Sequence, residues 1–361
     1  PNSAAMLTAK TNPFFFIMCV LEAVAFVRDN LPKPRWSGTC DRDVVACANL
    51  SSRGTRASTV FRVGPCIERS GMMAEIWLAT SSDFPELWSD DQLLLSAFKE
   101  AGHVARAAVW SDPDLDWSTP DAVIIRSCWD YFHRADDFAA WLAVMRAART
   151  ELINAPDLIA WNMDKHYLSD LGSRGVEVPH ITWFELGEEL PDLGSLLREH
   201  GLSQVVYKPA ISGNALHTWR GSLATIDEDR ARLASLTSER AMMLQPFFPE
   251  IIEEGEVSLI FFGGAFSHAV KKVPAEGDFR VQAEYGGAVI PITPSEELIA
   301  QAANVLAGVR EGDCVYARVD GVVTEARGFV LMELEVIEPE LFFRTSSKAP
   351  SALVSAVLDL L

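Results

Sequence analysis

From Ala74 onward, short apolar runs alternate with longer stretches whose apolar residues recur every three or four positions. The short runs predict β-strands, and the periodic stretches predict amphipathic helices. In the first part of this region the pattern gives strands at 74–79, 103–110, 121–126 and 152–154, with helices at 89–101 and 135–148. Because strands that alternate with helices are typical of a parallel sheet, we predict a small α/β domain here.

The second half of the chain has strands joined by short turns and a long amphipathic helix at 295–310. Gly263-Gly264 lies between two apolar runs and predicts a hairpin with a two-residue turn. In the register that follows from this turn, Glu256 lies opposite Lys271. A cross-strand ion pair is the plainest interpretation of these two residues.

A second hairpin carries acidic residues on two otherwise apolar, β-branched strands that flank a polar break at 324–328. In the predicted register Asp320 lies opposite Glu333, and Glu335 shares their face. Because facing like charges destabilise a sheet, we expect a cation among them. Mg²⁺ fits, since it binds one or two carboxylates together with phosphate oxygens and water. The alternative is a solvated face on which Arg318, opposite Glu335, neutralises part of the charge.

Composition narrows the choice of function. A chain of 361 residues that is 49% hydrophobic can bury a large core in two or three domains. The net charge of −19 argues against nucleic-acid and membrane partners, which require a basic face. Outside the first 72 residues, Cys128 and Cys314 form no metal or disulfide pattern, which favours a reducing, cytoplasmic location.

Residues 1–72 lack the regular alternation of the rest of the chain. Their apolar run at 14–21 is too short to span a bilayer and only faintly resembles a secretory signal, because Glu22 interrupts it. We expect 1–72 to be a disordered or dispensable leader.

Two single residues suggest chemistry. Lys208 ends a predicted buried strand at 205–209, just before an irregular loop, which suits a phosphate, although a lone lysine is more often a surface residue. Cys128 lies in a loop after a strand, where open α/β sheets bind ligands. It is either a nucleophile or, more commonly, a small buried residue.

Taken in order, the motifs of residues 73–345 resemble the ATP-grasp superfamily, in the subgroup of glutathione synthetase and ribosomal-protein glutamate ligases. Lys165 leads a helix, and Lys208 precedes a loop of small residues. Gln245-Pro-Phe-Phe248 is similar to the hinge that reads adenine, and Glu256 to the acid that binds ribose. Arg280, Gln282 and Gly286-Gly287 follow the arginine, amide and paired-glycine spacing of the family.

The resemblance implies an α/β fold of the ATP-grasp type. It places a small parallel α/β domain at 73–156, a lid subdomain at 157–244 and a C-terminal subdomain with a metal site at 245–361, the last two clasping ATP. It also implies four groups of site residues: for ATP, Lys165, Lys208, Ser212, Gly213, Gln245, Phe247, Phe248 and Glu256; for substrate, Ser267, His268, Lys272 and Gln282; for catalysis, Arg280, Gly286 and Gly287; for the metal, Asp320, Glu333 and Glu335.

Three positions depart from the family pattern. The loop after Lys208 has one glycine where many relatives have several, Pro246 replaces an acidic hinge residue, and Glu335 stands where many relatives have Asn. These departures affect lid closure, adenine contacts and the charge balance of the metal site.

Within the superfamily, motifs such as Trp161-Asn-Met-Asp-Lys165 and Gly277-Asp-Phe-Arg-Val-Gln282 are similar to those of the cyclo-ligases that close O-ureido-serine in cycloserine biosynthesis. The resemblance implies an ADP-forming enzyme that uses ATP with Mg²⁺ or Mn²⁺ to couple a carboxylate and an amine of a small molecule through an acyl phosphate. An intermolecular amino-acid or peptide ligase, a small-molecule kinase and a nucleotide-binding regulator remain as alternatives. Neither the amine nor the oligomeric state follows from the sequence.

Overall fold

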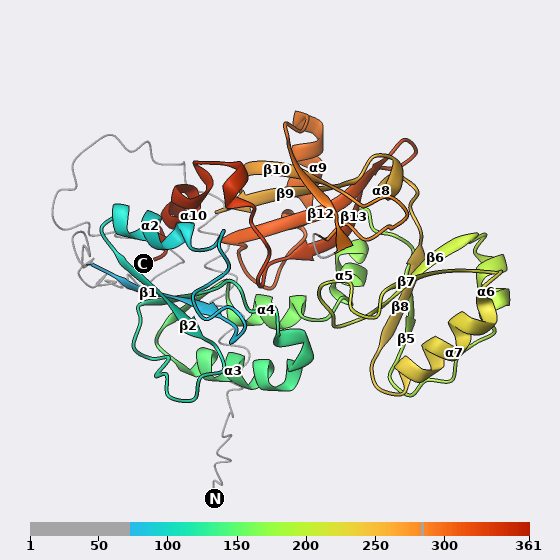
Figure 1. Cartoon of the computed structure of the whole chain (residues 1–361), viewed down its shortest axis with the longest axis horizontal. Helices are drawn as coiled ribbons and strands as arrows, with labels where there is room; N and C mark the ends of the chain where they lie inside the picture. Colours follow the sequence, from blue (N-terminus) through green and yellow to red (C-terminus); the bar gives the residue numbers. More distant parts are fainter. Residues whose placement is uncertain (1–72, 283–284) are drawn as a thin grey trace, which may run out of the picture. The chain divides into compact units, whose positions relative to one another are not determined.

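The computed structural model describes residues 73–282 and 285–361 (Figure 1). The predicted leader, 1–72, lies outside the described residues. The described part contains three sheets, with strand orders β2-β1-β3-β4, β5-β8-β6-β7 and β11-β10-β9-β12-β13. The first is parallel, and the pairings of the other two are antiparallel. This arrangement confirms the predicted α/β class with two α+β regions after a parallel domain.

The first sheet divides its side chains between two cores because successive residues of a strand point to opposite faces. Ile76 and Leu78 pack with helices α2 and α10, whereas Trp77 and Ala79 pack with α3. In Figure 1, α2 and α10 lie on one side of this sheet and α3 lies on the other. The elements are β1 (Glu75–Thr80), α2 (Leu93–Glu100), β2 (Val104–Val109), β3 (Ala122–Ile125), α3 (Ala135–Ala147), β4 (Glu151–Ile153) and α10 (Ala349–Leu358).

The second sheet is covered by two helices whose leucines, among them Leu197 and Leu233, bury Val205 and Tyr207. Its elements are β5 (Thr182–Phe184), α6 (Leu193–Glu199), β6 (Gln204–Pro209), β7 (Trp219–Ser222), α7 (Ile226–Thr237) and β8 (Met242–Pro246). Strand β8 carries this sheet two residues past the lid boundary that we predicted at residue 244.

The third sheet packs one face against three helices, with Leu158, Leu168 and Ala302 meeting Leu259 and Phe261. Helices α4 and α5 therefore belong to this core, although the predicted boundary at 157 assigned them to the lid. The elements are α4 (Pro156–Asn162), α5 (Tyr167–Ser173), α8 (Glu250–Glu253), β9 (Glu256–Phe262), β10 (Ala265–Val273), β11 (Ala288–Ile292), α9 (Glu296–Ala307), β12 (Tyr316–Thr324) and β13 (Gly328–Glu335), with 3₁₀ turns η1 (Tyr131–His133) and η3 (Phe343–Thr345).

The two predicted hairpins form, but the register of one differs. Asp320 pairs with Glu333, as predicted. In the other hairpin a β-bulge at Ser267 shifts the pairing by one residue, so Lys272 and not Lys271 lies opposite Glu256. Because the side-chain period of a strand is two, this shift turns Lys272 toward Glu256 and Asp320.

The first and third sheets are connected through the buried phenol of Tyr316. Its hydroxyl lies 2.6 Å from the carbonyl oxygen of Ile337, 3.1 Å from that of Ile153 and 3.2 Å from that of Ile125. Asn154 supports the same junction by donating its side-chain amide to the carbonyl oxygens of Tyr316 and Val336.

We expect Tyr316→Phe to lower the free energy of unfolding by about 1–3 kcal/mol, because the buried carbonyl oxygens lose their donor. Urea unfolding measures the change. As a control, Tyr285→Phe removes a hydroxyl that donates to Asn214 at 3.3 Å near the surface, and it should change stability by less than about 0.5 kcal/mol. Equal effects of the two variants would contradict a structural role for the Tyr316 hydroxyl.

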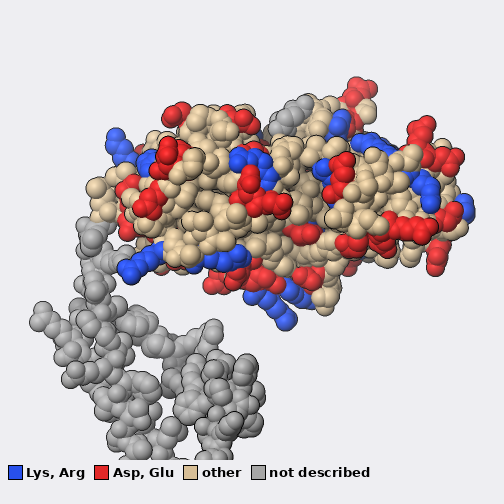
Figure 2. Space-filling model, turned by 90° about the horizontal axis from the view of Figure 1, so that it is seen from below, with Lys and Arg blue, Asp and Glu red and all other residues tan. Residues whose placement is uncertain are grey.

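Acidic and basic side chains are interspersed on the face drawn in Figure 2, with no continuous basic surface there. Among the described residues, no helix combines the length and apolarity needed to cross a bilayer.

Candidate active site

A cavity of about 800 Å³ brings together residues from all three sheets. Lys208 and Gln245 reach it from the second sheet, Glu333 from the third, and Trp129 from a loop of the first. Most of the predicted site residues therefore lie around one space.

Two lysines line the cavity next to the second sheet. Lys165 is 5% exposed, and its ammonium donates to the carbonyl oxygen of Ser212 at 2.8 Å and lies 3.1 Å from the Glu333 carboxylate. Lys208 forms no ion pair within residues 73–282 and 285–361, and burial lowers its pKa. A half-buried ammonium without a close anion is a suitable phosphate ligand.

The predicted metal ligands are neutralised by protein cations. Asp320 accepts hydrogen bonds from Lys272 at 2.8 Å and from Arg318 at 2.9 and 3.0 Å. Arg318 also bonds the carboxylate of Glu335. In the described part of the chain, no three His, Cys, Asp or Glu side chains stand close enough to hold a metal ion. In this conformation the bulge in β10 brings Lys272 to Asp320, so a protein cation stands beside this carboxylate, and the metal-ligand role of the three carboxylates stays a prediction.

The protein cations nevertheless do not fully stabilise the charged forms of Glu335 and Glu338. Burial, together with Asp320 and Glu333, raises the pKa of Glu335 to about 7 despite the opposing effect of Arg318. Burial and Glu335 likewise raise the pKa of Glu338. Glu333, Glu335 and Glu338 all line the cavity. Glu335 and Glu338 resist ionisation chiefly because they are buried, and a divalent cation that enters with phosphate oxygens would favour their charged forms.

Lys272 links two of the acidic residues. Its ammonium lies 2.5 Å from Glu256 and 2.8 Å from Asp320. Burial opposes its charge, but Asp320 and Glu256 outweigh this effect and raise the pKa of Lys272. Lys272 is therefore a permanent cation in the cavity wall.

The hinge segment offers a polar atom that has no partner. Gln245 is buried, and among the described residues its side-chain oxygen accepts no hydrogen bond. An exocyclic amino group such as that of adenine would satisfy this oxygen.

Phe248 packs with Val322, Val330 and Met332, and neither Phe247 nor Phe248 lines the cavity. The amide of Phe247 donates to the carbonyl oxygen of Gln204 at 3.0 Å. The predicted contact of these two residues with adenine would therefore require rearrangement.

The segment around Arg280 is held by local contacts. Arg280 bonds Asp278 at 2.7 Å and lies 3.5 Å above the Tyr285 ring. Arg280 and Gln282 line the cavity, whereas Gly286 and Gly287 do not.

In this conformation, local contacts or position oppose the predicted roles of Gly287, Ser267 and His268. The amide of Gly287 donates to the carbonyl oxygen of Gln282 at 3.2 Å, so it is engaged and cannot serve here as an oxyanion donor. Ser267 and His268 also lie outside the cavity lining. His268 is 2.9 Å from the carbonyl oxygen of Leu341 and 3.0 Å from the Ser267 hydroxyl, which are structural contacts. Ser212 and Gly213 line the cavity, as predicted.

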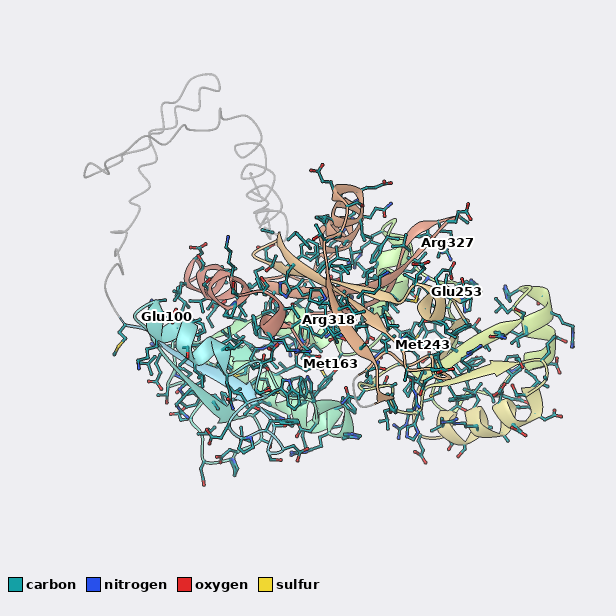
Figure 3. The ribbon with its side chains drawn as sticks, turned by 45° about the horizontal axis from the view of Figure 1, so that its top comes forward. Glu100, Met163, Met243, Glu253, Arg318 and Arg327 are labelled. Atoms are coloured by element: carbon teal, nitrogen blue, oxygen red, sulfur yellow. The ribbon has the colours of Figure 1, made fainter. Side chains whose placement is uncertain are left out.

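Arg318 lies opposite Glu335, as the predicted register placed it, and bonds that carboxylate. It lies within the third sheet, whereas Arg327, from the same hairpin, lies away from it at the turn (Figure 3). Other cavity residues carried no clear signal in the sequence. The first domain contributes Phe84, Trp88 and Trp129, whose ring centroids lie 5.3–5.7 Å apart. Trp129 belongs to the strand-end loop that we predicted as ligand-binding, whereas Cys128 beside it is buried, and its pKa is raised by burial.

Parts of the chain are similar to known proteins. Residues 76–154 match the family model described as D-cycloserine synthetase DcsG, N-terminal domain. The chain is 30% identical over 182 residues to the cycloserine biosynthesis protein DcsG of Streptomyces lavendulae, and this alignment covers 50% of the chain and 60% of that relative.

Several solved structures are also similar to this chain. The crystal structure of D-cycloserine synthetase DcsG superimposes with a TM-score of 0.71 at 26% identity, over 79% of this chain and 99% of that one. The D-alanine–D-alanine ligase of Bacillus anthracis complexed with ATP gives 0.58 at 15% identity, over 79% and 96%. The ATP-grasp ligase PsnB, complexed with a minimal precursor, Mg and ADP, gives 0.53 at 18% identity, over 78% and 96%. The described part of the chain therefore has the fold of these ATP-grasp ligases, and its N-terminal domain is similar to that of D-cycloserine synthetase.

Proposed function

We propose that the chain is an ADP-forming ligase that couples a carboxylate to an amine in an amino-acid-like small molecule. The observation that carries the proposal is that Lys165 and Lys208 line one cavity together with Glu333 and Glu335. Cations that face acidic residues suit a triphosphate with its divalent metal. We further propose that the reaction is the intramolecular closure of O-ureido-serine, because the chain is similar to a D-cycloserine synthetase.

ATP and Mg²⁺ would bind between these two groups of residues. Lys165 and Lys208 would hold phosphate oxygens, and the side-chain oxygen of Gln245 would meet the base. Glu333 and Glu335, with Asp320, would hold Mg²⁺, which when bound supplies charge neutralisation for phosphoryl transfer. Asp320 contacts two protein cations, Lys272 and Arg318, whereas Glu333 and Glu335 each contact one, so Glu333 and Glu335 are the better ligands.

The reaction balances as two transfers. A carboxylate oxygen of the substrate attacks the terminal phosphorus of ATP, ADP leaves, and an acyl phosphate forms. The amine nitrogen then attacks the carbonyl carbon, phosphate leaves with the electron pair of the broken C–O bond, and the amine proton passes to solvent. Arg318 and Lys272 are placed to stabilise negative charge in this part of the cavity.

Incubation with ATP, Mg²⁺ and a panel that includes O-ureido-serine and D-alanine tests the proposal, with ADP, phosphate and product mass as readouts. A ligase gives ADP, free phosphate and a product lighter than its substrates by one water. Closure of O-ureido-serine to cycloserine additionally requires hydrolytic loss of the carbamoyl group as ammonia and carbon dioxide, so both product masses are monitored. A stable phosphorylated product would instead show a kinase, and nucleotide binding without ADP formation would show a regulator. A product whose mass corresponds to two joined molecules would show an intermolecular ligase and contradict the intramolecular reaction.

Arg280 offers a kinetic test of its proposed catalytic role. If it leaves Asp278 to stabilise the phosphoryl group in the transition state, Arg280→Ala should lower kcat by roughly two to three orders of magnitude and change the KM for ATP far less. Arg280→Lys should rescue poorly, because an ammonium lacks the planar two-donor edge. An Arg280→Ala enzyme with near-normal kcat would leave Arg280 as the partner of Asp278 alone.

A further inference from the structure

The cavity arginines differ in how many of their donors are occupied. Arg318 uses Nε, Nη1 and Nη2 on Asp320, Glu335 and the carbonyl oxygen of Glu340. Arg280 directs Nε and Nη2 at Asp278. Arg344 uses only Nη1, which lies 3.2 Å from Asp90 and 2.6 Å from Glu340. Within the described residues, Nε and Nη2 of Arg344 donate no hydrogen bond.

Contacts with Asp90 and Phe342 fix the position of the Arg344 side chain. Asp90 is 5% exposed and accepts the backbone amide of Arg344 at 2.8 Å as well as its side chain. Phe342, two residues before Arg344, has a positive φ of 49°, and its ring lies 5.3 Å from the Arg344 guanidinium. An arginine that is anchored through one nitrogen presents its opposite Nε–Nη2 edge in a defined orientation, which reduces the entropy cost of binding.

The surroundings of this edge are suited to a small organic acid. Arg344 lines the same cavity as the aromatic residues Phe84, Trp88 and Trp129. The indole of Trp129 donates to the carbonyl oxygen of Glu338 at 3.0 Å and so ties this aromatic wall to the segment that carries Arg344. The two parallel donors of a guanidinium edge match the two oxygens of a carboxylate.

We propose that Arg344 is a specificity-determining residue that binds the α-carboxylate of an amino-acid substrate through its Nε–Nη2 edge. The inference rests on the proposed ligase function and names the group that the substrate must carry. Lys208 forms no ion pair with the described residues and remains available for phosphate, so nucleotide and amino acid would use different cations.

The test compares O-ureido-serine with its carboxamide in calorimetric titrations of the full chain. A charge-assisted bidentate contact predicts that the wild type binds the acid about 10- to 100-fold more tightly than the amide. Arg344→Gln should bind the two equally. Arg344→Lys should keep the ion pair with Asp90, and hence the melting temperature, yet should not restore the preference for the acid. A purely structural role predicts that Lys restores both properties.

Arg146→Gln is the matched control, because Arg146 is paired with Asp157 at 2.9 Å and does not line the cavity. It should retain the preference for the acid. A wild type that does not distinguish acid from amide, or an Arg344→Lys variant that does, would overturn the proposal. Selective binding through Arg344 without ADP formation would instead refute the ligase function alone. ADP formation with an unchanged KM for the acid in Arg344→Lys would refute only the role of Arg344.

Discussion

Glu333→Gln is expected to abolish ATP turnover while the protein remains folded. Glu333 lies 3.1 Å from Lys165 and lines the cavity next to Glu335. Lys165 and Lys208 outweigh the burial of Glu333 and lower its pKa, so the residue is ionised at neutral pH. Losing this charge removes a metal ligand, and we expect ADP formation to fall by at least two to three orders of magnitude.

The fold should tolerate this change for two reasons. The glutamine oxygen can still accept a hydrogen bond from Lys165, which also keeps its bond to the carbonyl oxygen of Ser212. The substitution also removes repulsion between Glu333 and the neighbouring Asp320. The matched control is Glu325→Gln, an exposed residue in the turn of the same hairpin, which should keep full turnover. Unchanged turnover of Glu333→Gln at limiting Mg²⁺ would mean that Glu333 binds no metal.

Arg318→Met is expected to destabilise the protein more than any other single change proposed here. Arg318 is 8% exposed and bonds Asp320 and Glu335 at once. Burial opposes its charge, but Asp320 and Glu335 outweigh this effect and raise its pKa. Removing one partner of a buried charge pair costs on the order of 3–5 kcal/mol, because the remaining carboxylates stay buried without compensation.

Thermal unfolding should show a decrease in Tm of roughly 4–8 °C for a chain of this size. The triple change Arg318→Met, Asp320→Asn, Glu335→Gln should recover much of the loss, since it removes the uncompensated carboxylates together with the cation. Arg318→Lys should be intermediate because an ammonium cannot bond both carboxylates with the same geometry. A decrease below about 2 °C for Arg318→Met would contradict the importance of this ion network.

The two hairpins show what the sequence could and could not predict. The Asp320–Glu333 pairing was predicted correctly although the turn is one residue shorter than assumed, because a bulge after Asp320 restores the offset. The bulge at Ser267 had no such compensation, so the predicted Glu256–Lys271 pair was wrong. Neither bulge has a glycine or proline at the inserted position that would have indicated it.

The candidate site likewise contains residues that the sequence could identify and residues that it could not. Lys165, Lys208 and Gln245 could be placed because each stands in a local motif of a strand or helix end. Trp88 and Arg344 could not, because Trp88 comes from a loop of the first domain and Arg344 follows the last strand. Only the tertiary structure joins them, through the contact of Arg344 with Asp90. Such long-range pairs leave no periodic signal in a single sequence.

The central claim, coupling through an acyl phosphate, is tested most directly by isotope transfer. The substrate that supports ADP formation is prepared with ¹⁸O in its carboxylate, and the phosphate released in one turnover is analysed by mass spectrometry. The account predicts one ¹⁸O atom in each phosphate, because the bridging oxygen leaves with phosphorus when the amine attacks. Unlabelled phosphate, or AMP in place of ADP, would contradict it.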